Sequence, residues 1–336
     1  MDNVTHSLVG LMLARAVLDR GEKGAAIMVV LAANAPDIDG ISFFSDTLTY
    51  LEQHRGYVHS LAFAPLVALI PLLLVKLVTW TRITLWSYFA CVVAVLSHLM
   101  LDWTNVYGVR LMLPFSAHWF HLDVNPLAEP FILLILVLSW AIPALMGLIG
   151  GYQIGGEQRG KVAPAPRRAW AIFALIAITA YDTARWRSHE RAISMMAAKS
   201  YYREAEAEKI YAFPPQFGFS PLVWRGIVEI PGAIYDLTVD VNRPLYVTPD
   251  KMHPTVEHTP VNDLAMDTAL GSRAFRVFES FNQVPFWILR QEQNATRVQL
   301  LDLRFGSLGI PGFRAEAVVR WPTGELLESR FAMGGR

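Results

Sequence analysis

The chain has 336 residues, of which 53% are hydrophobic and only 17% are charged, and its mean hydropathy is +0.32. These values are too apolar for an ordinary soluble domain and are typical of membrane proteins. The formal net charge is zero, so no basic surface of the kind that binds nucleic acid is expected. The single cysteine excludes a disulfide framework and a cysteine-rich zinc site, so any metal must be held by His and carboxylates.

Long stretches without charged residues dominate the first half of the chain. Crossing a bilayer as a helix takes about 20 apolar residues. We expect a membrane domain over 1–187 with about six helices, the first two short or half-inserted, at about 4–18, 24–35, 58–75, 83–101, 130–156 and 169–186. The last span carries Asp182 and Arg185, which we expect to pair with each other.

Lys and Arg in short loops indicate the orientation, because such loops stay in the cytoplasm. The basic residues fall on alternate connections and therefore on one side: Arg15, Arg20 and Lys23; Lys76 and Arg82; Arg159, Lys161, Arg167 and Arg168. The other connections, 34–57 and 103–129, then face outward. The same count predicts that the N-terminus and the C-terminal region face outward too.

After Arg187 the long apolar runs disappear, which predicts a soluble C-terminal region. Residues 188–215 are rich in Ala, Glu and Lys and predict a helical connector. Residues 216–336 predict a small, mostly antiparallel β domain, because β-rich segments alternate with Pro and Gly. The expected strands include Leu222–Ile230, Ile234–Val241, Ala274–Phe278, Arg297–Phe305 and Ala315–Trp321.

Two motifs in the first half combine His or Asp at close spacing. His98 and Asp102 are four residues apart on a predicted helix, so they share one face and could bind one ion. A hydrogen-bonded pair between helices is the alternative, since such a polar pair is costly inside an apolar span unless it is satisfied. Asp37 and Asp39 lie in a loop bounded by Pro and Gly, where they are either ligands or turn and cap residues.

Two further motifs supply histidines. His54 and His59 come just before a predicted span, as ligands or as ordinary residues of the membrane interface. His6 lies near the start of the first helix, as a ligand or as a capping-region residue. Arg55 could bind a phosphate or carboxylate in bidentate fashion, or simply extend its head group to the interface.

The predicted topology places all four motifs on the same membrane face, and chance explains that poorly. Imidazole together with carboxylate suits zinc or manganese better than calcium or magnesium. The number of candidate ligands allows one or two ions, which would activate water. The sequence contains no Gly-x-Ser-x-Gly motif, P-loop or Rossmann fingerprint, so serine nucleophiles and nucleotide chemistry lack support.

In this order, the motifs resemble the YdjM-like family of bacterial inner-membrane metal-dependent hydrolases. The resemblance covers about the first 130 residues and rests on Asp2 to Gly10, Pro36 to Asp39, His54 to Ser60, Ser97-His98, Asp102-Trp103, Tyr107-Gly108 and Leu113 to Ser116. It implies a bacterial inner-membrane location and metal-dependent hydrolysis. It also implies the following metal-site residues: His6, Asp37, Asp39, His59, His98 and Asp102.

We therefore expect a membrane-bound hydrolase that acts on an ester or phosphoester of a lipid or envelope molecule through metal-activated water. The bilayer and an amphiphilic or phosphorylated substrate are the expected partners. His54 would act as general acid or base and Arg55 would hold the anionic group. The alternatives are a non-enzymatic metal-binding membrane protein, such as a sensor or scaffold, and a transporter, which the gathering of polar residues near one face disfavours.

Overall fold

The computed structural model describes residues 1–18, 24–79, 82–151, 167–215, 220–254, 262–306 and 312–334. The chain divides into two compact units, one made of residues 1–39 and 55–187, the other of residues 40–54 and 188–336. Segment 40–54, which the sequence places in the membrane domain, thus belongs to the second unit. Parts of the expected loops and of the fifth expected helix lie outside the described residues: Arg20, Lys23, 152–156, Arg159 and Lys161.

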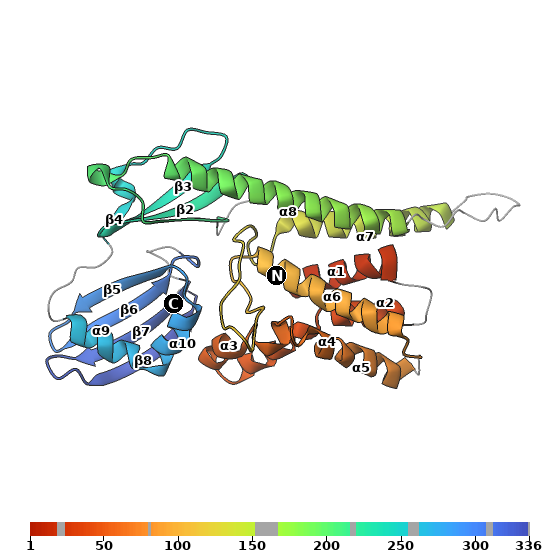
Figure 1. Ribbon diagram of the computed structural model, residues 1–336, viewed down its shortest axis with the longest axis horizontal. Helices are drawn as coiled ribbons and strands as arrows, with labels where there is room; N and C mark the ends of the chain where they lie inside the picture. The colour runs from red at the N-terminus through yellow and green to blue at the C-terminus, as the bar shows by residue number, and fades with distance from the viewer. Residues whose placement is uncertain are drawn as a thin grey trace, which may run out of the picture. The chain divides into compact units, whose positions relative to one another are not determined.

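The first unit is helical (Figure 1). Its helices are α1 (Asn3–Leu13), α2 (Ala25–Ala32), α4 (Ala64–Val67), α5 (Leu69–Thr79), α6 (Leu85–Thr104), α7 (Pro130–Gly151) and the first part of α8 (Arg167–Ala197). Irregular turns join them: a π-helical turn at Ala14–Leu18 and 3₁₀ segments at Ala35–Phe44, which continues into the second unit, and Tyr57–His59.

Helix α6 is the centre of this unit and contacts α1, α2, α4 and α5. It begins in a capping box, in which Thr84 and Ser87 each bind the other's backbone N–H. Small residues bring α1 and α2 together, since a Cβ atom at Gly10 would lie only 2.8 Å from the Cβ of Ala33. This close contact fixes the end of α2 beside the first helix.

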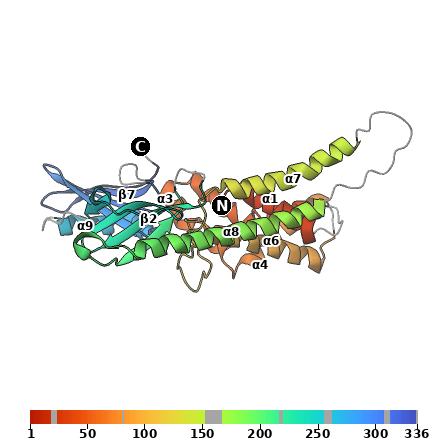
Figure 2. The same ribbon diagram turned by 90° about the horizontal axis from the view of Figure 1, so that it is seen from above.

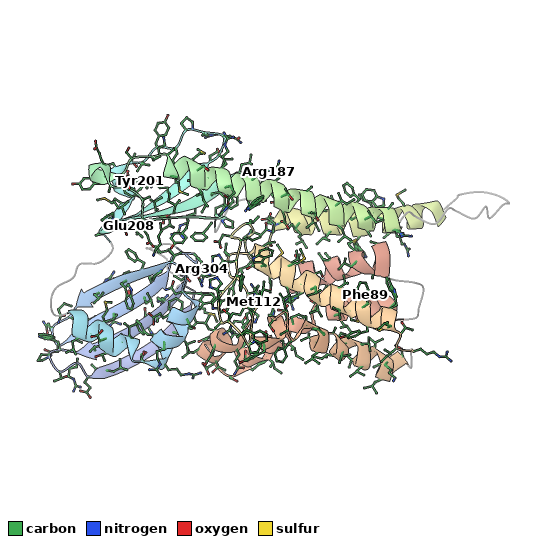
Figure 3. All side chains as sticks on the ribbon, in the orientation of Figure 1. Phe89, Met112, Arg187, Tyr201, Glu208 and Arg304 are labelled. Atoms are coloured by element: carbon green, nitrogen blue, oxygen red, sulfur yellow. The ribbon has the colours of Figure 1, made fainter. Side chains whose placement is uncertain are left out.

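Apolar side chains on the outside of α6 fit a membrane environment. Phe89, labelled in Figure 3, is 49% exposed and Leu85 is 84% exposed. Among the described residues, α6 is the one helix long and apolar enough to cross a bilayer, and up to three spans result if each of two bent helix pairs counts as one. The six-helix membrane topology expected from the sequence stays a prediction.

The second unit contains two four-stranded antiparallel sheets. The first has the order β1 (Lys209–Phe213), β2 (Val223–Ile230), β3 (Ala233–Asp240) and β4 (Met252–Pro254). The second has the order β5 (Pro285–Gln291), β6 (Ala295–Asp302), β7 (Phe313–Arg320) and β8 (Leu326–Met333). The predicted fold class, a helical domain followed by a β-rich domain, is confirmed.

Three helices pack against the second sheet or against each other. These are α3 (Thr47–Gln53), α9 (Asn262–Leu270) and α10 (Arg273–Phe281). The predicted strand over 274–278 is wrong, because this segment lies in α10. Ser272 caps the helix by accepting from the N–H of Phe275, and apolar residues at positions 274, 275, 278 and 281 form one buried helical face.

The end of α8 packs on the first sheet. Helix α8 runs unbroken to Ala197 (Figure 2), and Ala192 and Met196 join the buried cluster around Trp224. Gly226 on β2 makes room for Met196, because a Cβ atom at this position would lie 2.2 Å from the methionine sulfur. The segment predicted as a helical connector, 188–215, is therefore α-helical only in its first part and also contains β1.

Candidate metal centre

Four side chains of the first unit direct their ligand atoms at one place. They are Asp37, from the 3₁₀ segment after α2, His59, from the short turn before α4, and His98 and Asp102, from the last turns of α6. One ligand atom from each lies within 4.8 Å of all the others. The side chains of His59, His98 and Asp102 are fully buried and that of Asp37 is 15% exposed.

Five of the six distances between these ligand atoms are close to those in a tetrahedral coordination shell, and the sixth, between Asp37 and Asp102, is within 4.8 Å. His98 Nε2 lies 3.2 Å from His59 Nε2, 3.4 Å from Asp102 Oδ2 and 3.6 Å from Asp37 Oδ1. His59 Nε2 lies 3.4 Å from Asp37 Oδ1 and 3.7 Å from Asp102 Oδ2. Ligand bonds of about 2.0–2.2 Å place tetrahedral ligands roughly 3.3–3.6 Å apart. The four side chains therefore fit one zinc-sized ion.

The contacts of the two Nδ1 atoms explain why the Nε2 atoms of His59 and His98 face each other. His98 Nδ1 lies 2.7 Å from the carbonyl oxygen of Ala33, which can only accept, so Nδ1 carries the hydrogen. His59 Nδ1 faces Asp39 Oδ2 at 3.0 Å, which favours the hydrogen on Nδ1 there too. In the neutral rings both Nε2 atoms then present lone pairs to each other at 3.2 Å. A proton on one Nε2 or a shared metal ion would bridge this pair, and a backbone or carboxylate partner behind the imidazole is usual for metal ligands.

The other two predicted metal-site residues adjoin the four. Asp39 contacts His59 from behind, as described above, and is not one of the four converging groups. His6 stacks on His98 with ring centroids 3.7 Å apart, and its Nε2 lies 3.5 Å from Asp102 Oδ1. Neither ring nitrogen of His6 makes a hydrogen bond to the part of the chain that the structure describes. The ligand roles of all six residues stay predictions.

Arg55 fixes Asp102 from the other side. Its guanidinium donates to Asp102 Oδ1 at 2.9 Å, to Asn105 Oδ1 at 3.1 Å and to the carbonyl oxygen of Gly108 at 2.8 Å, and it stacks over the ring of Tyr107. Asp102 Oδ1 also pairs with the amino group of Met1. Arg55 is only 4% exposed. These contacts give Arg55 a positioning role toward Asp102.

His54, the other predicted catalytic residue, lies at the end of α3 in the second unit. Its ring stacks on Tyr50 with centroids 4.6 Å apart. It is not among the four converging groups. The catalytic roles of His54 and Arg55 stay predictions.

The sequence analysis did not identify two groups of this centre, the side chain of Asn105 and the backbone carbonyl of Ala33. Asn105 is fully buried and its Oδ1 also accepts from the backbone N–H of Tyr107, which closes the turn after α6. An Asn directly after a helix, three residues from Asp102, is a turn signal that could have identified it. The backbone oxygen of Ala33 carries no sequence signal, because any residue supplies a carbonyl.

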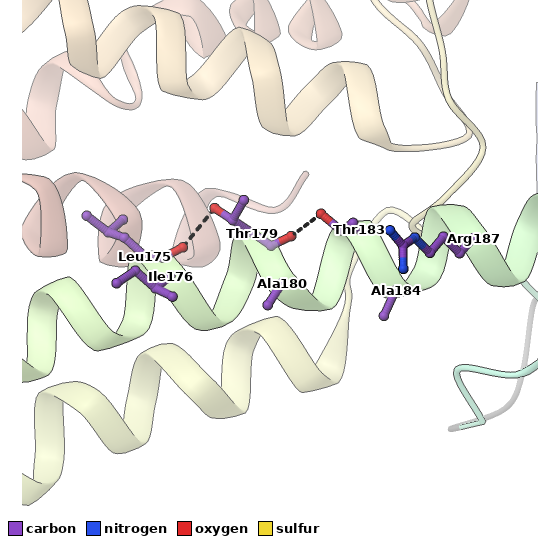
Figure 4. A pocket seen from close by; sticks show the side chains of 7 residues that line it. All are labelled: Leu175, Ile176, Thr179, Ala180, Thr183, Ala184 and Arg187. Atoms are coloured by element: carbon purple, nitrogen blue, oxygen red, sulfur yellow. Dashed lines mark hydrogen bonds between the residues drawn. The ribbon is translucent and has the colours of Figure 1, made fainter.

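A separate feature of the first unit is a hollow along α8. It measures about 750 Å³, and the seven residues that line it all belong to α8, from Leu175 to Arg187 (Figure 4). The hydroxyl groups of Thr179 and Thr183 donate back to carbonyls of their own helix. None of the four converging groups lines this hollow.

A helical unit with an apolar central helix, carrying a buried Asp/His centre and followed by a two-sheet unit, defines a membrane protein with a candidate metal site. The sequence profile of the YdjM inner membrane protein family matches residues 1–192. This match covers more than half of the chain, so the chain belongs to that family. The predicted family is confirmed, and the match extends beyond the first 130 residues on which the resemblance rested.

One relative is the uncharacterized protein YfhP of Bacillus subtilis (strain 168). It is 31% identical over 144 residues, which are 39% of this chain and 43% of YfhP. The matched part thus spans less than half of that relative. No solved structure matches the chain.

Proposed function

We propose that the chain is a membrane-bound metal-dependent hydrolase that cleaves an ester or phosphoester of a lipid or envelope molecule. The observation that carries this proposal is the convergence of ligand atoms of Asp37, His59, His98 and Asp102 within 4.8 Å of one another. Two imidazoles and two carboxylates suit zinc or manganese. His6, which stacks on His98, would be available as a ligand for a second ion.

The residues around the centre would hold its geometry in place. Asp39 and the carbonyl oxygen of Ala33 orient the two imidazoles, and Arg55 fixes the carboxylate of Asp102. A bound divalent metal would supply Lewis-acid activation of water near neutral pH. Asp37 is the one partly exposed member of the four, so substrate would approach from its side.

The position of the ligands favours an amphiphilic substrate. His98 and Asp102 lie in the last two turns of α6, the helix that is apolar and long enough to cross a bilayer. Groups near the end of such a helix lie near the membrane boundary. A lipid or lipid-linked phosphoester presents its polar head group at that depth.

A second candidate is a metal-binding protein without catalytic activity. The complete burial of His59, His98 and Asp102 favours it, because structural zinc sites are closed by four protein ligands whereas catalytic sites keep one position open. The two functions differ in whether an added anion can reach the ion.

The test uses the full chain purified in detergent and loaded with zinc, manganese or cobalt. We expect turnover on a panel of phospholipids and phosphoesters, a cobalt absorption spectrum that changes on adding phosphate, and loss of both in His98→Ala and Asp37→Ala. His118→Ala, an exposed histidine outside the centre, should retain both. Bound metal with no turnover and a spectrum insensitive to phosphate would favour the non-enzymatic protein.

We also propose that the chain crosses the bacterial inner membrane several times, with the metal centre and the C-terminal unit in the periplasm. The alternation of basic loops along the sequence supports this orientation. A phosphatase fused after residue 336 should be active in intact cells. An inactive fusion that is expressed at the same level would contradict the orientation.

A further inference from the structure

A groove in the first unit lies between α1, α6 and α8. It has a volume of about 470 Å³, which is in the usual range for ligand sites. Its walls include Val9 and Leu13 from α1, Met100 and Leu101 from α6 and Ile178 from α8. It shares Leu175, Thr179 and Thr183 with the hollow of Figure 4. The body of the groove is therefore apolar, as a hydrocarbon chain requires.

Among the described residues that line the groove, Asp182 is the only charged one. Its Oδ1 accepts a hydrogen bond from Asn125 at 2.8 Å. The guanidinium of Arg185, the expected partner, donates to the carbonyl oxygen of Val124 at 2.7 and 3.1 Å, and its charge acts on Asp182. Asp182 thus places a carboxyl group, held by the amide of Asn125, at the wall of the groove.

Two indole rings accompany this carboxylate. Trp103, at the end of α6, and Trp186, one turn after Asp182 on α8, line the same groove. Residues four apart on a helix lie on one face, so Asp182 and Trp186 face the groove together. Carboxylate and tryptophan are the groups that attract an ammonium ion, the first by charge and the second by cation–π interaction.

We propose that this groove binds an amine-bearing phospholipid, with the ammonium group at Asp182, Trp103 and Trp186 and one acyl chain along Val9, Leu13 and Ile178. Membership of an inner-membrane family makes lipid the surrounding medium, and a carboxyl group beside two indole rings favours a cationic head group over an anionic one. None of the four groups of the metal centre lines the groove. The proposal therefore does not depend on hydrolase activity.

Native mass spectrometry of the detergent-purified full chain tests this inference. The chain is incubated with equal amounts of phosphatidylethanolamine and phosphatidylglycerol that carry identical acyl chains. These lipids differ in the ammonium group, so we expect the wild-type chain to retain phosphatidylethanolamine in about tenfold excess. Asp182→Asn keeps an acceptor for Asn125 and should reduce that excess to near one while lipid remains bound.

A variant that fills the groove separates the acyl chain from the head group. Thr179→Trp, at an exposed position of the groove wall, should abolish retention of both lipids. The matched control is Leu77→Trp on α5, which is 74% exposed and lies outside the groove, and it should retain both. Equal retention of the two lipids by the wild-type chain, an unchanged ratio in Asp182→Asn, or undiminished lipid in Thr179→Trp would each overturn the proposal.

Discussion

Each unit buries an aspartate with an arginine, and the two pairs are built differently. In the second unit Arg304 (labelled in Figure 3) binds both oxygens of Asp302 at 2.6–3.0 Å and the carbonyl oxygen of Phe281 at 2.8 Å. In the first unit Arg55 binds only Oδ1 of Asp102, and Oδ2 faces two imidazole nitrogens at 3.4 and 3.7 Å. The carboxylates of Asp102 and Asp302 are both fully buried.

This difference teaches that a buried charge alone does not mark a functional site. The Asp302–Arg304 pair satisfies its own hydrogen bonds, which is what a buried structural ion pair requires. Around Asp102 the second carboxylate oxygen and two imidazole nitrogens instead converge with a further carboxylate, that of Asp37. The convergence of several ligand atoms, and not burial, distinguishes the candidate metal centre from the ion pair.

The largest expected effect separates the two aspartates by metal content. Asp102→Asn replaces one ligand without changing its size, and we expect bound metal to fall to background in elemental analysis of the purified chain. Asp302→Asn, the matched change in the second unit, should leave metal content unchanged. Equal metal content in Asp102→Asn and wild type would remove the distinction between the two sites.

The second largest expected effect is on the stability of the second unit. Arg304→Met leaves Asp302 buried and unpaired, which should destabilise the second unit by about 3–5 kcal/mol. Hydrogen exchange of the β6 and β7 amides in the full chain measures this loss. The double variant Asp302→Leu with Arg304→Met should recover most of it, because no charge is left unpaired. A double variant as unstable as the single one would show that packing around Arg304, and not charge, dominates.

A smaller effect concerns the residue behind His59. Asp39→Ala removes the carboxylate that faces Nδ1, and loss of such an outer partner typically weakens metal binding about 10–100-fold. Competition with a chelator measures the affinity. Asp46→Ala, which removes the exposed cap of α3, should leave the affinity unchanged. A complete loss of metal in Asp39→Ala would instead make Asp39 a direct ligand.

The smallest effect is the pH dependence of the second unit. Burial alone would raise the pKa of Glu316, but hydrogen bonds from Arg314, Arg330 and Gln299 outweigh it and lower the pKa below its usual value. The carboxylate therefore stabilises the fold above about pH 4.3, the ordinary Glu value, and this contribution is lost as the pH falls through the lowered pKa.

Chemical denaturation of the full chain between pH 3 and 7 checks the sign. In Glu316→Gln we expect the stability of the second unit to fall less on acidification than in wild type. Glu325→Gln, a change at an exposed carboxylate, should follow the wild-type profile. A wild-type profile in Glu316→Gln would show that other carboxylates control acid unfolding.

Much of the fold could be predicted because it is encoded locally. The apolar run of α6 and the alternation of β2, β3 and β6 appear directly in the sequence. The error at α10 has a clear cause: Phe275, Val277 and Phe278 favour strands by composition, but the cap at Ser272 and the spacing of buried side chains favour a helix. The strand propensity of these residues is outweighed because the buried face of α10 packs against β7 and β8.

The sequence by itself determined the chemistry of the candidate centre: which residue types are available, that His98 and Asp102 share one helical face, and that no cysteine can contribute. Only the tertiary structure decided which side chains meet, that Asp39 lies behind His59, and that Arg55 is buried against Asp102. Helical spacing is a local property, whereas the meeting of Asp37, His59 and α6 depends on the packing of α1 and α2 around it. That packing fixes the carbonyl of Ala33 and so the orientation of His98, through contacts between residues far apart in the chain.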